Sequence, residues 1–391
     1  MTVQQRRICV VTGSRAEYGL LYWILHDLRA DLDMELQLVV TGMHLAPEFG
    51  MTVREIEADG FEISRRVEML LASDTPGGVA KSMGLGVIGL SDALEQLAPD
   101  LVLMLGDRYE ILAAAGACLL HRVPVAHIAG GDTSEGAIDE SIRHAVTKMS
   151  HVHFVTNEQS AQRVRQLGED PLRIHIVGSP GLDHLRRRPL LERSALEHAL
   201  GAQLGARNLL VTFHPVTLAA DNGRQQLVEL LAALDSLPPD IVLWFTRPNA
   251  DAGGRSLSVM LDDWVAMRRD RAHVYSSLGQ LRYLSLMSLV NAVVGNSSSG
   301  LYEAPSFYVP TVDVGDRQRG RLAAASVLRC EPQSQAIRAA IHKAMALDCT
   351  DIVNPYGDGR SAARIVDILR ALPPTDQLLR KSFHISAAER V

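Results

Sequence analysis

Short apolar runs rich in Val, Ile and Leu alternate with amphipathic stretches along the whole chain, and this alternation most constrains the fold. In the first half the apolar runs occupy residues 8–12, 35–42, 101–106, 123–130 and 151–155, and helical patterns occupy residues 16–30, 79–97, 109–121 and 138–149. Continuous apolar runs of this length are typical of parallel strands that are buried on both faces. The alternation therefore predicts a doubly wound α/β sheet, whose ligands bind beyond the carboxyl ends of the strands.

The same pattern restarts after about residue 183, beyond a polar helical segment. Five further apolar runs lead into loops, at residues 208–215, 241–249, 272–277, 291–300 and 309–317. A chain of 391 residues is long enough for two or three such domains. We therefore expect a first Rossmann-like domain over residues 1–182, a second over 183–370, and a polar, frayed tail over 371–391.

Composition excludes several classes of protein. A net charge of −6 argues against a nucleic-acid partner, because phosphate backbones require clustered Lys and Arg. No apolar stretch reaches the roughly 18 residues that span a bilayer, and the run ICVV is too short for a signal peptide because TGSR interrupts it. The four cysteines form no CxxC pair, which favours free thiols over disulfides or zinc. We expect a cytoplasmic protein without membrane contact.

Charged and hydroxyl side chains follow the predicted strands at their carboxyl ends. In the first half these candidates for substrate contact or catalysis are Ser14, Arg15, Glu17, His44, Asp107, Arg108, Asp132, Glu135, Asp139, Arg143 and His144. In the second half they are His214, Asn249, Ser297, Ser298, Ser299, Glu303 and Arg317. Because the carboxyl ends of parallel strands meet at one edge of a sheet, each set is expected to gather at one site.

Several of these residues also fit a purely structural role. Ser14 and Glu17 match a capping box, S-x-x-E, which needs no ligand. Arg15 suits a phosphate or a carboxylate, since a helix cap has no use for a guanidinium. Asp107 can cap the next helix, but as part of GDRYE it also places a base beside the cation of Arg108.

The segment HIAGGDTSEGAIDESIRHAVTKMS is the richest in candidate groups. Its glycines permit close approach of a ligand, and Asp139 lies in the first turn of the next helix, where the helix dipole favours an ionised carboxylate. Asp139 and Arg143 also match a plain i,i+4 ion pair. His151 and His153 alternate along one strand, but a suitably spaced third ligand is missing, so we do not expect a metal site.

Two loops of the second half suit a phosphate group. GNSSSG supplies hydroxyls and backbone N–H groups at the start of a predicted helix that carries Glu303, although a serine cap explains part of it. GDRQRGR is either a solvated loop or a phosphate clamp, and His214 in FHP is a candidate acid, base or diphosphate contact. The sequence contains no GxGxxG after the first strand, no GxxxxGK[ST] and no GxSxG, which argues against NAD, P-loop and serine-hydrolase chemistry.

Taken together and in this order, the motifs resemble the UDP-N-acetylglucosamine 2-epimerase family, and most closely its hydrolysing branch. The resemblance runs from VTGSRAEYG through VTGMH, LGDRYE, HIAGGD, DESIRHAVTKMS, FHP and GNSSSGLYE to GDRQRGR. It implies two Rossmann-like domains that face a cleft, the GT-B arrangement, with a UDP-sugar as substrate. It also implies a homodimer, no metal and no nicotinamide cofactor.

The implied reaction eliminates UDP across C1–C2 to give a 2-acetamidoglucal and then adds water with inversion at C2. By resemblance, Asp107 and Asp139 match catalytic carboxylates, and His214 matches a histidine near the leaving phosphate. Ser297, Ser298, Glu303 and Arg317 match nucleotide contacts, with Glu303 on the ribose, and Arg15 and His44 match residues that line the sugar and diphosphate site. The free manno-configured sugar would serve nonulosonic acid synthesis of the sialic or legionaminic type.

One position departs from the family pattern. Ala129 replaces a glutamate that several relatives carry at the third position of HIxGGD, and Asp132 or Glu135 are the nearby carboxylates that could replace it. The substrate stays open between UDP-N-acetylglucosamine (UDP-GlcNAc) and UDP-2,4-diacetamido-2,4,6-trideoxyglucose, although TGMHLAPEFG and VEMLLASDT look more like the branch that acts on the diacetamido sugar. Alternative functions are a non-hydrolysing epimerase, a GT-B glycosyltransferase and a non-catalytic sugar-nucleotide sensor.

Overall fold

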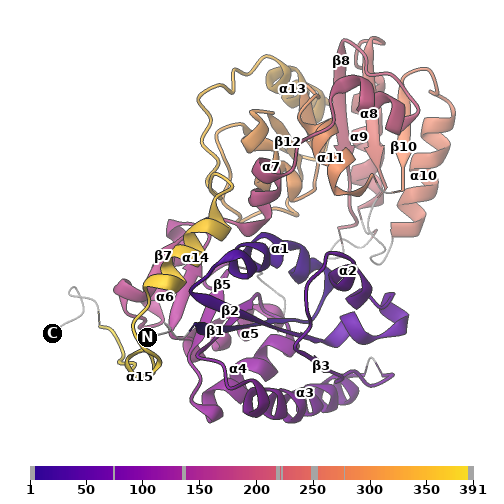
Figure 1. Cartoon of the computed structure of the whole chain (residues 1–391). Coiled ribbons are helices and arrows are strands. Elements are labelled where there is room, and N and C mark those ends of the chain that lie inside the picture. The colour runs from indigo at the N-terminus through magenta and orange to yellow at the C-terminus, as the bar shows by residue number, and fades with distance from the viewer. Residues whose placement is uncertain are drawn as a thin grey trace. The chain divides into compact units, whose positions relative to one another are not determined.

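The computed structural model describes residues 5–73, 75–133, 138–216, 221, 223–247, 254–276 and 278–385 (Figure 1). Its contacts divide the chain into two compact α/β domains. The first contains the residues up to His184 together with those from Tyr356 onward, and the second contains Leu185–Pro355. Each domain is built on one parallel sheet, so the expected fold class is confirmed.

Seven parallel strands form the sheet of the first domain, in the order β3-β2-β1-β4-β5-β6-β7. They are β1 (Arg6–Thr12), β2 (Met34–Thr41), β3 (Arg65–Val67), β4 (Leu101–Leu105), β5 (Val125–Ile128), β6 (Val152–Val155) and β7 (Ile174–Ile176). Side chains of the central strand β1 alternate between two cores, with Ile8 and Val10 on one face and Cys9 and Val11 on the other. Burial on both faces explains why ICVV contains no polar residue.

Helices cover both faces of this sheet. The helical segments of the first domain are α1 (Arg15–Ala30), η1 (Gly42–Leu45), η2 (Pro47–Phe49), α2 (Val53–Ala58), α3 (Pro76–Leu97), α4 (Tyr109–His121), α5 (Ile138–Met149), α6 (Glu158–Gln166), η3 (Pro171–Arg173), η4 (Pro180–Leu182), α14 (Ser361–Ala371) and α15 (Thr375–Leu378). Apolar side chains of α1 and α14 share one core with β1, whereas α3, α4 and α5 share the other.

Six parallel strands form the sheet of the second domain, in the order β10-β9-β8-β11-β12-β13. They are β8 (Arg207–Thr212), β9 (Ile241–Thr246), β10 (Ala272–Tyr275), β11 (Ala292–Gly295), β12 (Thr311–Val314) and β13 (Val327–Cys330). The helical segments are α8 (Arg193–Leu200), α9 (Arg224–Asp235), α10 (Gly254–Ala266), α11 (Gly279–Met287), α12 (Ser299–Tyr302), η5 (Ala304–Phe307) and α13 (Ser334–Met345). The short helix α7 (Asp183–Arg187) begins in the first domain and ends in the second. Leu209 and Val211 of β8 pack with α9, α10 and α13, and Leu210 packs with α8 and α11 on the other face.

The C-terminal boundary differs from the expected one. Residues 356–370, which we expected in the second domain, belong to the first, because α14 packs its apolar face on α1. The carboxylate of Asp183 accepts hydrogen bonds from the backbone N–H groups of Ser361 and Ala362 at 2.9 and 2.8 Å, which fixes the start of α14. The chain therefore returns to its first domain after completing the second.

The four cysteines are unpaired, in agreement with the expectation of free thiols. Cys9, Cys118 and Cys349 are buried and Cys330 is half-buried. Within the described ranges, no helix is both long enough and apolar enough to cross a bilayer.

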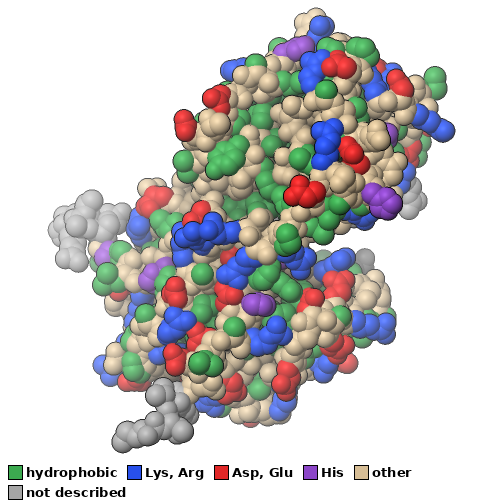
Figure 2. Space-filling view, turned by 45° about the horizontal axis from the view of Figure 1, so that its top comes forward, with side chains coloured by type: hydrophobic (Ala, Val, Ile, Leu, Met, Phe, Trp, Pro, Cys, Tyr) green, Lys and Arg blue, Asp and Glu red, His purple; other side chains and the backbone are tan. Residues whose placement is uncertain are grey.

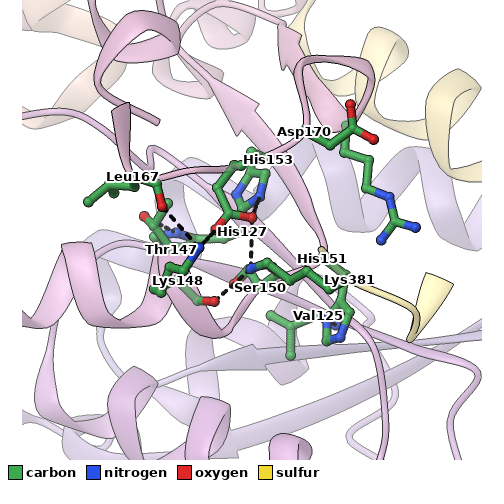
Figure 3. A network of polar contacts seen from close by, with 12 residues as sticks. Val125, His127, Thr147, Lys148, Ser150, His151, His153, Leu167, Asp170 and Lys381 are labelled. Atoms are coloured by element: carbon green, nitrogen blue, oxygen red, sulfur yellow. Dashed lines mark hydrogen bonds and ion pairs between the residues drawn. The ribbon is translucent and has the colours of Figure 1, made fainter. Parts of the chain in front are cut away.

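The described part of the tail, through residue 385, is anchored rather than frayed. Lys381 donates to the buried carboxylate of Glu169 at 2.7 Å and to the carbonyl oxygens of Lys148 and Ser150 at the end of α5, as Figure 3 shows for the residues around it. Glu169 also accepts from Lys148 at 2.7 Å and pairs with His153 at 3.0 Å. Burial raises the pKa of Glu169, but these partners outweigh it and lower that pKa to about 2.

The two histidines considered as metal ligands have structural partners instead. His153 pairs with Glu169, and the Nδ1 atom of His151 accepts from the backbone N–H of Val125 at 3.1 Å (Figure 3). Burial lowers the pKa of both imidazoles, to about 4 for His151, so both are neutral near pH 7. The described residues contain no group of three or more His, Cys, Asp and Glu side chains arranged for a metal ion.

We predict that Lys381→Met loosens the tail. It removes one partner of a buried carboxylate, so the first domain should lose about 1–3 kcal/mol of unfolding free energy. The backbone N–H of His384, which donates to the carbonyl of Gly168 at 2.9 Å, should exchange faster with deuterium. Chemical denaturation and hydrogen exchange measure the two effects.

Lys343→Met is the matched control, because Lys343 is exposed on α13 in the other domain. It should change the unfolding free energy by less than about 0.5 kcal/mol. The stabilisation from Glu169 should be complete above pH 4.5, the ordinary pKa of a glutamate, and should be lost as the pH falls toward 2. Equal exchange at His384 in wild type and Lys381→Met would show that the contact does not hold the tail.

Candidate active site

Arg143 of α5 joins three segments at the carboxyl edge of the first sheet. Its Nη2 atom donates to Asp107, which follows β4, and its Nη1 atom donates to Glu140 at 3.0 Å and to the carbonyl of Asp132 at 2.7 Å. Only 5% of the Arg143 side chain is exposed, against 25% for Asp107. A buried guanidinium must be paired to be tolerated, so these contacts set the position of the Asp107 carboxylate while leaving part of it accessible.

Asp107 therefore does not serve as the cap of α4. The N-cap of α4 is Arg108, which makes no side-chain cap hydrogen bond, and Asp107 is turned to Arg143 instead. The expected i,i+4 pair of Asp139 with Arg143 is replaced by the i,i+3 pair of Glu140 with Arg143. Asp139 lies in the first turn of α5 and is partly exposed.

The carboxylate of Asp132 is turned toward the start of α6. Its Oδ1 atom accepts hydrogen bonds from the hydroxyls of Thr156 at 2.7 Å and Ser160 at 2.6 Å. Burial raises the pKa of Asp132, and the two hydroxyls and the nearby guanidinium of Arg143 oppose that shift. Asp132 thus ties the loop after β5 to α6.

The loop after β5 begins with Ala129 in a left-handed conformation, at φ 65°. The N–H of Ala129 donates to the carbonyl of Phe154 at 2.9 Å. The pairing of β5 with β6 therefore continues up to the residue at which the backbone turns. Glu135, the second candidate to replace the missing glutamate, lies outside the described residues. The Nε2 atom of His144 donates to the carboxylate of Glu140 at 3.2 Å, so His144 belongs to the Arg143 cluster.

The loop after β1 is a helix cap, as its motif suggested. Ser14 caps α1 by accepting from the N–H of Glu17, and Glu17 accepts from the N–H of Gly13 at 2.7 Å. Glu17 is buried, and burial together with the charge of Glu110 raises its pKa to about 7. Arg108 limits that increase, because its guanidinium lies 4.0 Å from Glu17.

Arg108 is held at the sheet edge by Glu110, the last residue of the GDRYE motif. Two hydrogen bonds, at 3.2 and 3.0 Å, join the guanidinium to the fully buried carboxylate of Glu110. One of its nitrogens also lies 3.5 Å from the sulfur of Met43. The position of Glu110 two residues after Arg108 is a sequence signal for this pair, although it also matches an ordinary acidic residue in the first turn of a helix.

Arg15 and His44 lie in different environments. Arg15 pairs with Glu55 at 3.0 Å and 73% of its side chain is exposed, so it is accessible to an anion. His44 is fully buried between the hydroxyls of Thr12 at 3.1 Å and Thr52 at 2.8 Å. Burial lowers its pKa to about 4, so His44 is neutral and supports the loop after β2.

In the second domain, Asn296 organises the loops that follow β8 and β11. Its side chain accepts from the N–H of His214 at 2.6 Å and donates to the carbonyl of His214 at 2.9 Å. The carbonyl of Asn296 accepts from Arg317 at 3.2 Å and from Gln318 at 2.9 Å. Gly295 makes this geometry possible, because a Cβ atom there would lie 1.9 Å from the carbonyl oxygen of Thr212. Thus His214 and Arg317 are brought together around a residue that the sequence analysis passed over.

The serines of GNSSSG form a chain of hydroxyls. Ser299 lies 3.1 Å from the hydroxyl of Ser297 and 2.5 Å from that of Tyr283, and Ser298 is the N-cap of α12. The helix α12 has only four residues, Ser299–Tyr302, so it lacks the dipole of a longer helix. The groups in this loop that could bind an anion are therefore its hydroxyls and backbone N–H groups. Asn249, the remaining candidate of this domain, lies outside the described residues.

Glu303 follows α12 directly and carries a buried carboxyl group. Its Oε2 atom has no hydrogen-bond partner among the described residues. Burial raises its pKa to about 8, so the group is mostly protonated at pH 7. A buried carboxyl in need of partners is suited to a ligand that brings hydroxyl groups.

Comparison with known proteins identifies the family. The family model described as UDP-N-acetylglucosamine 2-epimerase matches residues 26–370. A GDP/UDP-N,N'-diacetylbacillosamine 2-epimerase (hydrolyzing) of Campylobacter jejuni is 41% identical over 329 residues, which are 84% of this chain and 85% of that protein. A UDP-N,N'-diacetylbacillosamine 2-epimerase (hydrolyzing) of Legionella pneumophila is 34% identical over 96% of this chain and 98% of its own length.

Solved structures agree on the fold. The UDP-GlcNAc 2-epimerase of Neisseria meningitidis, solved with UDP-GlcNAc bound, matches with a TM-score of 0.77 at 18% identity and covers 94% of this chain and 100% of its own. The enzyme of Methanocaldococcus jannaschii gives the same values. These likenesses extend over both domains, which have the α/β composition of the GT-B type. The chain therefore belongs to the UDP-N-acetylglucosamine 2-epimerase family, in its hydrolysing branch.

Proposed function

We propose that the protein converts a UDP-2-acetamido sugar and water into UDP and the free sugar with inverted configuration at C2. The observation that carries this proposal is the Asp107–Arg143–Glu140 cluster, which holds a partly accessible carboxylate at the carboxyl edge of the first sheet. The hydrolysing relatives at 41% and 34% identity support the same reaction. The free manno-configured sugar is the kind of precursor from which nonulosonic acids are made.

Asp107 acts as the base of the first half-reaction. The proton on C2 is weakly acidic, so its removal needs a carboxylate that is held in place. As Asp107 takes this proton, the C2–H electrons form the C1=C2 double bond and the C1–O bond to UDP breaks. The products of this step are a 2-acetamidoglucal and UDP, and the charge that develops on the diphosphate must be stabilised.

Asp139 acts in the second half-reaction, the hydration of the glycal. The hydroxyl of water adds to C1 and a proton adds to C2 from the face opposite to the one that lost it, which inverts C2. Asp139 lies in the first turn of α5, one turn before Arg143, and is partly exposed. The two carboxylates are therefore carried by different segments, α5 and the loop after β4, as two faces of one sugar require.

The second domain holds the nucleotide. The guanidinium of Arg317 and the backbone of His214 both contact Asn296, and the hydrogen-bonded hydroxyls of Ser297 and Ser299 follow it directly in the chain. Such donors suit a diphosphate. Glu303 supplies an acceptor for the ribose hydroxyls, which would provide the partners that its buried carboxyl lacks among the described residues.

The two candidate substrates differ at C4 and C6 of the sugar. N,N'-diacetylbacillosamine is 2,4-diacetamido-2,4,6-trideoxyglucose, and both hydrolysing relatives named above carry this sugar in their names. A polysialic acid biosynthesis protein of Escherichia coli is also 34% identical, over 93% of the chain. We favour the diacetamido sugar and keep UDP-GlcNAc as the alternative substrate. The homodimer that the resemblance implies belongs to the same proposal.

A first prediction concerns the two carboxylates. With either UDP-sugar in deuterated buffer, proton NMR should show UDP and a free manno-configured sugar with deuterium at C2. Asp107→Asn should lower UDP release by about 10²–10⁴-fold, since the base is lost, and should still hydrate added 2-acetamidoglucal. Asp139→Asn should slow hydration and let the glycal accumulate.

Asp92→Asn is the matched control, because Asp92 is exposed on α3; it should turn over like the wild type. Bound UDP should have nearly the same Kd in both catalytic variants, because neither residue contacts the nucleotide in the proposed scheme. Full turnover by Asp107→Asn would refute its role as the base. Formation of an epimerised UDP-sugar in place of free sugar would indicate the non-hydrolysing reaction, and UDP release that requires an acceptor would indicate a glycosyltransferase.

A second prediction concerns Glu303. Its pKa of about 8 keeps it mostly protonated at pH 7.5 in the free protein, and hydrogen bonds donated by ribose hydroxyls favour the ionised form. UDP binding should therefore release a large fraction of one proton at this pH, and the release should decline above pH 9. Titration calorimetry in buffers of different ionisation enthalpy measures it.

Glu303→Gln is the control for this measurement, because the amide keeps the shape and cannot ionise. It should remove the buffer-dependent part of the binding enthalpy. Proton uptake, or the same proton release in wild type and variant, would contradict the assignment of Glu303 to the ribose.

A further inference from the structure

A large pocket opens beside Arg108 at the carboxyl edge of the first sheet. It has a volume of about 550 Å³ and lies within the first domain. Its walls come from the loop after β2, from residues 70–73 before α3, and from Arg108 and Tyr109 at the start of α4. Pockets of this size accommodate small-molecule ligands or large parts of them. The walls include parts of the TGMHLAPEFG and VEMLLASDT segments that the sequence analysis singled out.

Apolar side chains make up most of the lining. They include Met43, Phe49, Leu70, Leu71, Val79 and Tyr109. Phe49 and Leu71 are 47% and 39% exposed, although both are large apolar residues. Apolar surface that faces water in a concave site is stabilised when a ligand with apolar groups covers it.

The wall formed by residues 70–73 is fixed to α3. The N–H of Leu71 donates to the hydroxyl of the buried Ser82 at 3.0 Å. Gly78 lies under Ser73, since a Cβ atom there would come within 2.4 Å of the Ser73 hydroxyl. Gly86 similarly leaves room for the side chain of Met69, because a Cβ atom at Gly86 would lie 2.8 Å from the terminal carbon of Met69. The pocket is thus preformed and does not depend on a ligand to order its wall.

Arg108 connects the pocket to the reacting groups. It lines the pocket, it follows Asp107 in the chain, and Glu110 and Met43 hold its guanidinium in place. Its contacts with Glu110 and Met43 use the Nε and Nη2 atoms, so Nη1 can donate to a ligand. The lining also contains polar side chains, among them Glu48 and Ser73. A sugar whose C2 meets Asp107 would extend its remaining substituents toward this wall.

We propose that this pocket selects the sugar by its substituents at C4 and C6, and that it takes the 4-acetamido and 6-methyl groups of a 2,4-diacetamido-2,4,6-trideoxy sugar. The proposal rests on the function proposed above. C4 lies across the pyranose ring from C1, so with C1 and C2 at the reacting groups, the C4 and C6 substituents point away from them. The diacetamido sugar has two methyl groups and one amide there. The methyl groups match the apolar side chains of the lining, the amide carbonyl matches the Arg108 donor, and the amide N–H matches an acceptor such as Glu48. UDP-GlcNAc has two hydroxyl groups there instead and lacks both methyl groups, so it would leave the apolar side chains uncovered.

The test measures kcat/KM for UDP-2,4-diacetamido-2,4,6-trideoxyglucose and for UDP-GlcNAc in wild type, Leu71→Asp and Phe49→Ala. Wild type should prefer the diacetamido substrate. Leu71→Asp places a charge on the apolar wall and should lower kcat/KM for that substrate about tenfold or more, with little effect on UDP-GlcNAc. Phe49→Ala should act in the same direction with a smaller loss. Both residues are partly exposed, so both variants should fold.

Ile88→Asp is the matched control, because Ile88 is 63% exposed on α3 and does not line the pocket; its selectivity should equal that of wild type. The proposal is overturned if Leu71→Asp and Phe49→Ala lower both substrates equally, if they change neither, or if wild type prefers UDP-GlcNAc. In those cases turnover by wild type still upholds the epimerase function. If wild type releases UDP from neither substrate, both the function and the pocket assignment fail.

Discussion

The buried guanidinium of Arg143 is the interaction on which the first-domain site depends. A charge that is 95% removed from solvent is stable only with paired acceptors, and it finds them on the loop after β4, the loop after β5 and its own helix. Asp107 lies 36 residues before Arg143 in the chain, whereas Asp132 and Glu140 are nearer, and the guanidinium fixes the relative positions of the three. The catalytic carboxylate that we propose, Asp107, therefore owes its orientation to Arg143 and, through it, to Glu140.

The sequence predicts the central strands well and the edges poorly. Strands such as β1 and β4 are buried on both faces, so their apolar runs are unambiguous. The edge strand β3, with the sequence RRV, exposes two of its three residues and carries no such run. The helix α14 has a clear apolar face, but periodicity does not say which domain that face will contact, and the boundary at residue 370 was wrong for this reason.

The sequence predicted which loops form the candidate site, but it did not predict the side-chain contacts within that site. Parallel topology alone places Asp107 and Asp139 at one edge, as their position after strands indicated. The contacts that hold the site residues could not be predicted. Glu140, which pairs with Arg143, looks like any acidic residue in a first helical turn, and Asn296, which contacts His214 and Arg317, looks like part of a serine loop. The sequence also does not show which candidate side chains are buried. His44 lies between two threonines and has no exposed surface, whereas the side chain of Arg15 is mostly exposed.

The two domains carry different arrangements of charge at the carboxyl edges of their sheets. At the first-domain edge, arginines pair with carboxylates, Arg143 with Asp107 and Arg108 with Glu110. In the proposed scheme the second-domain edge accepts a nucleotide diphosphate, for which the hydroxyls of Ser297 and Ser299 and the guanidinium of Arg317 are the donors. Burial raises the pKa of Glu303 to about 8, so its carboxyl is mostly protonated at pH 7. Its Oε2 atom has no partner among the described residues, and in the proposed scheme the ribose hydroxyls supply one, so that the free energy lost by burying this carboxyl is recovered when the nucleotide binds.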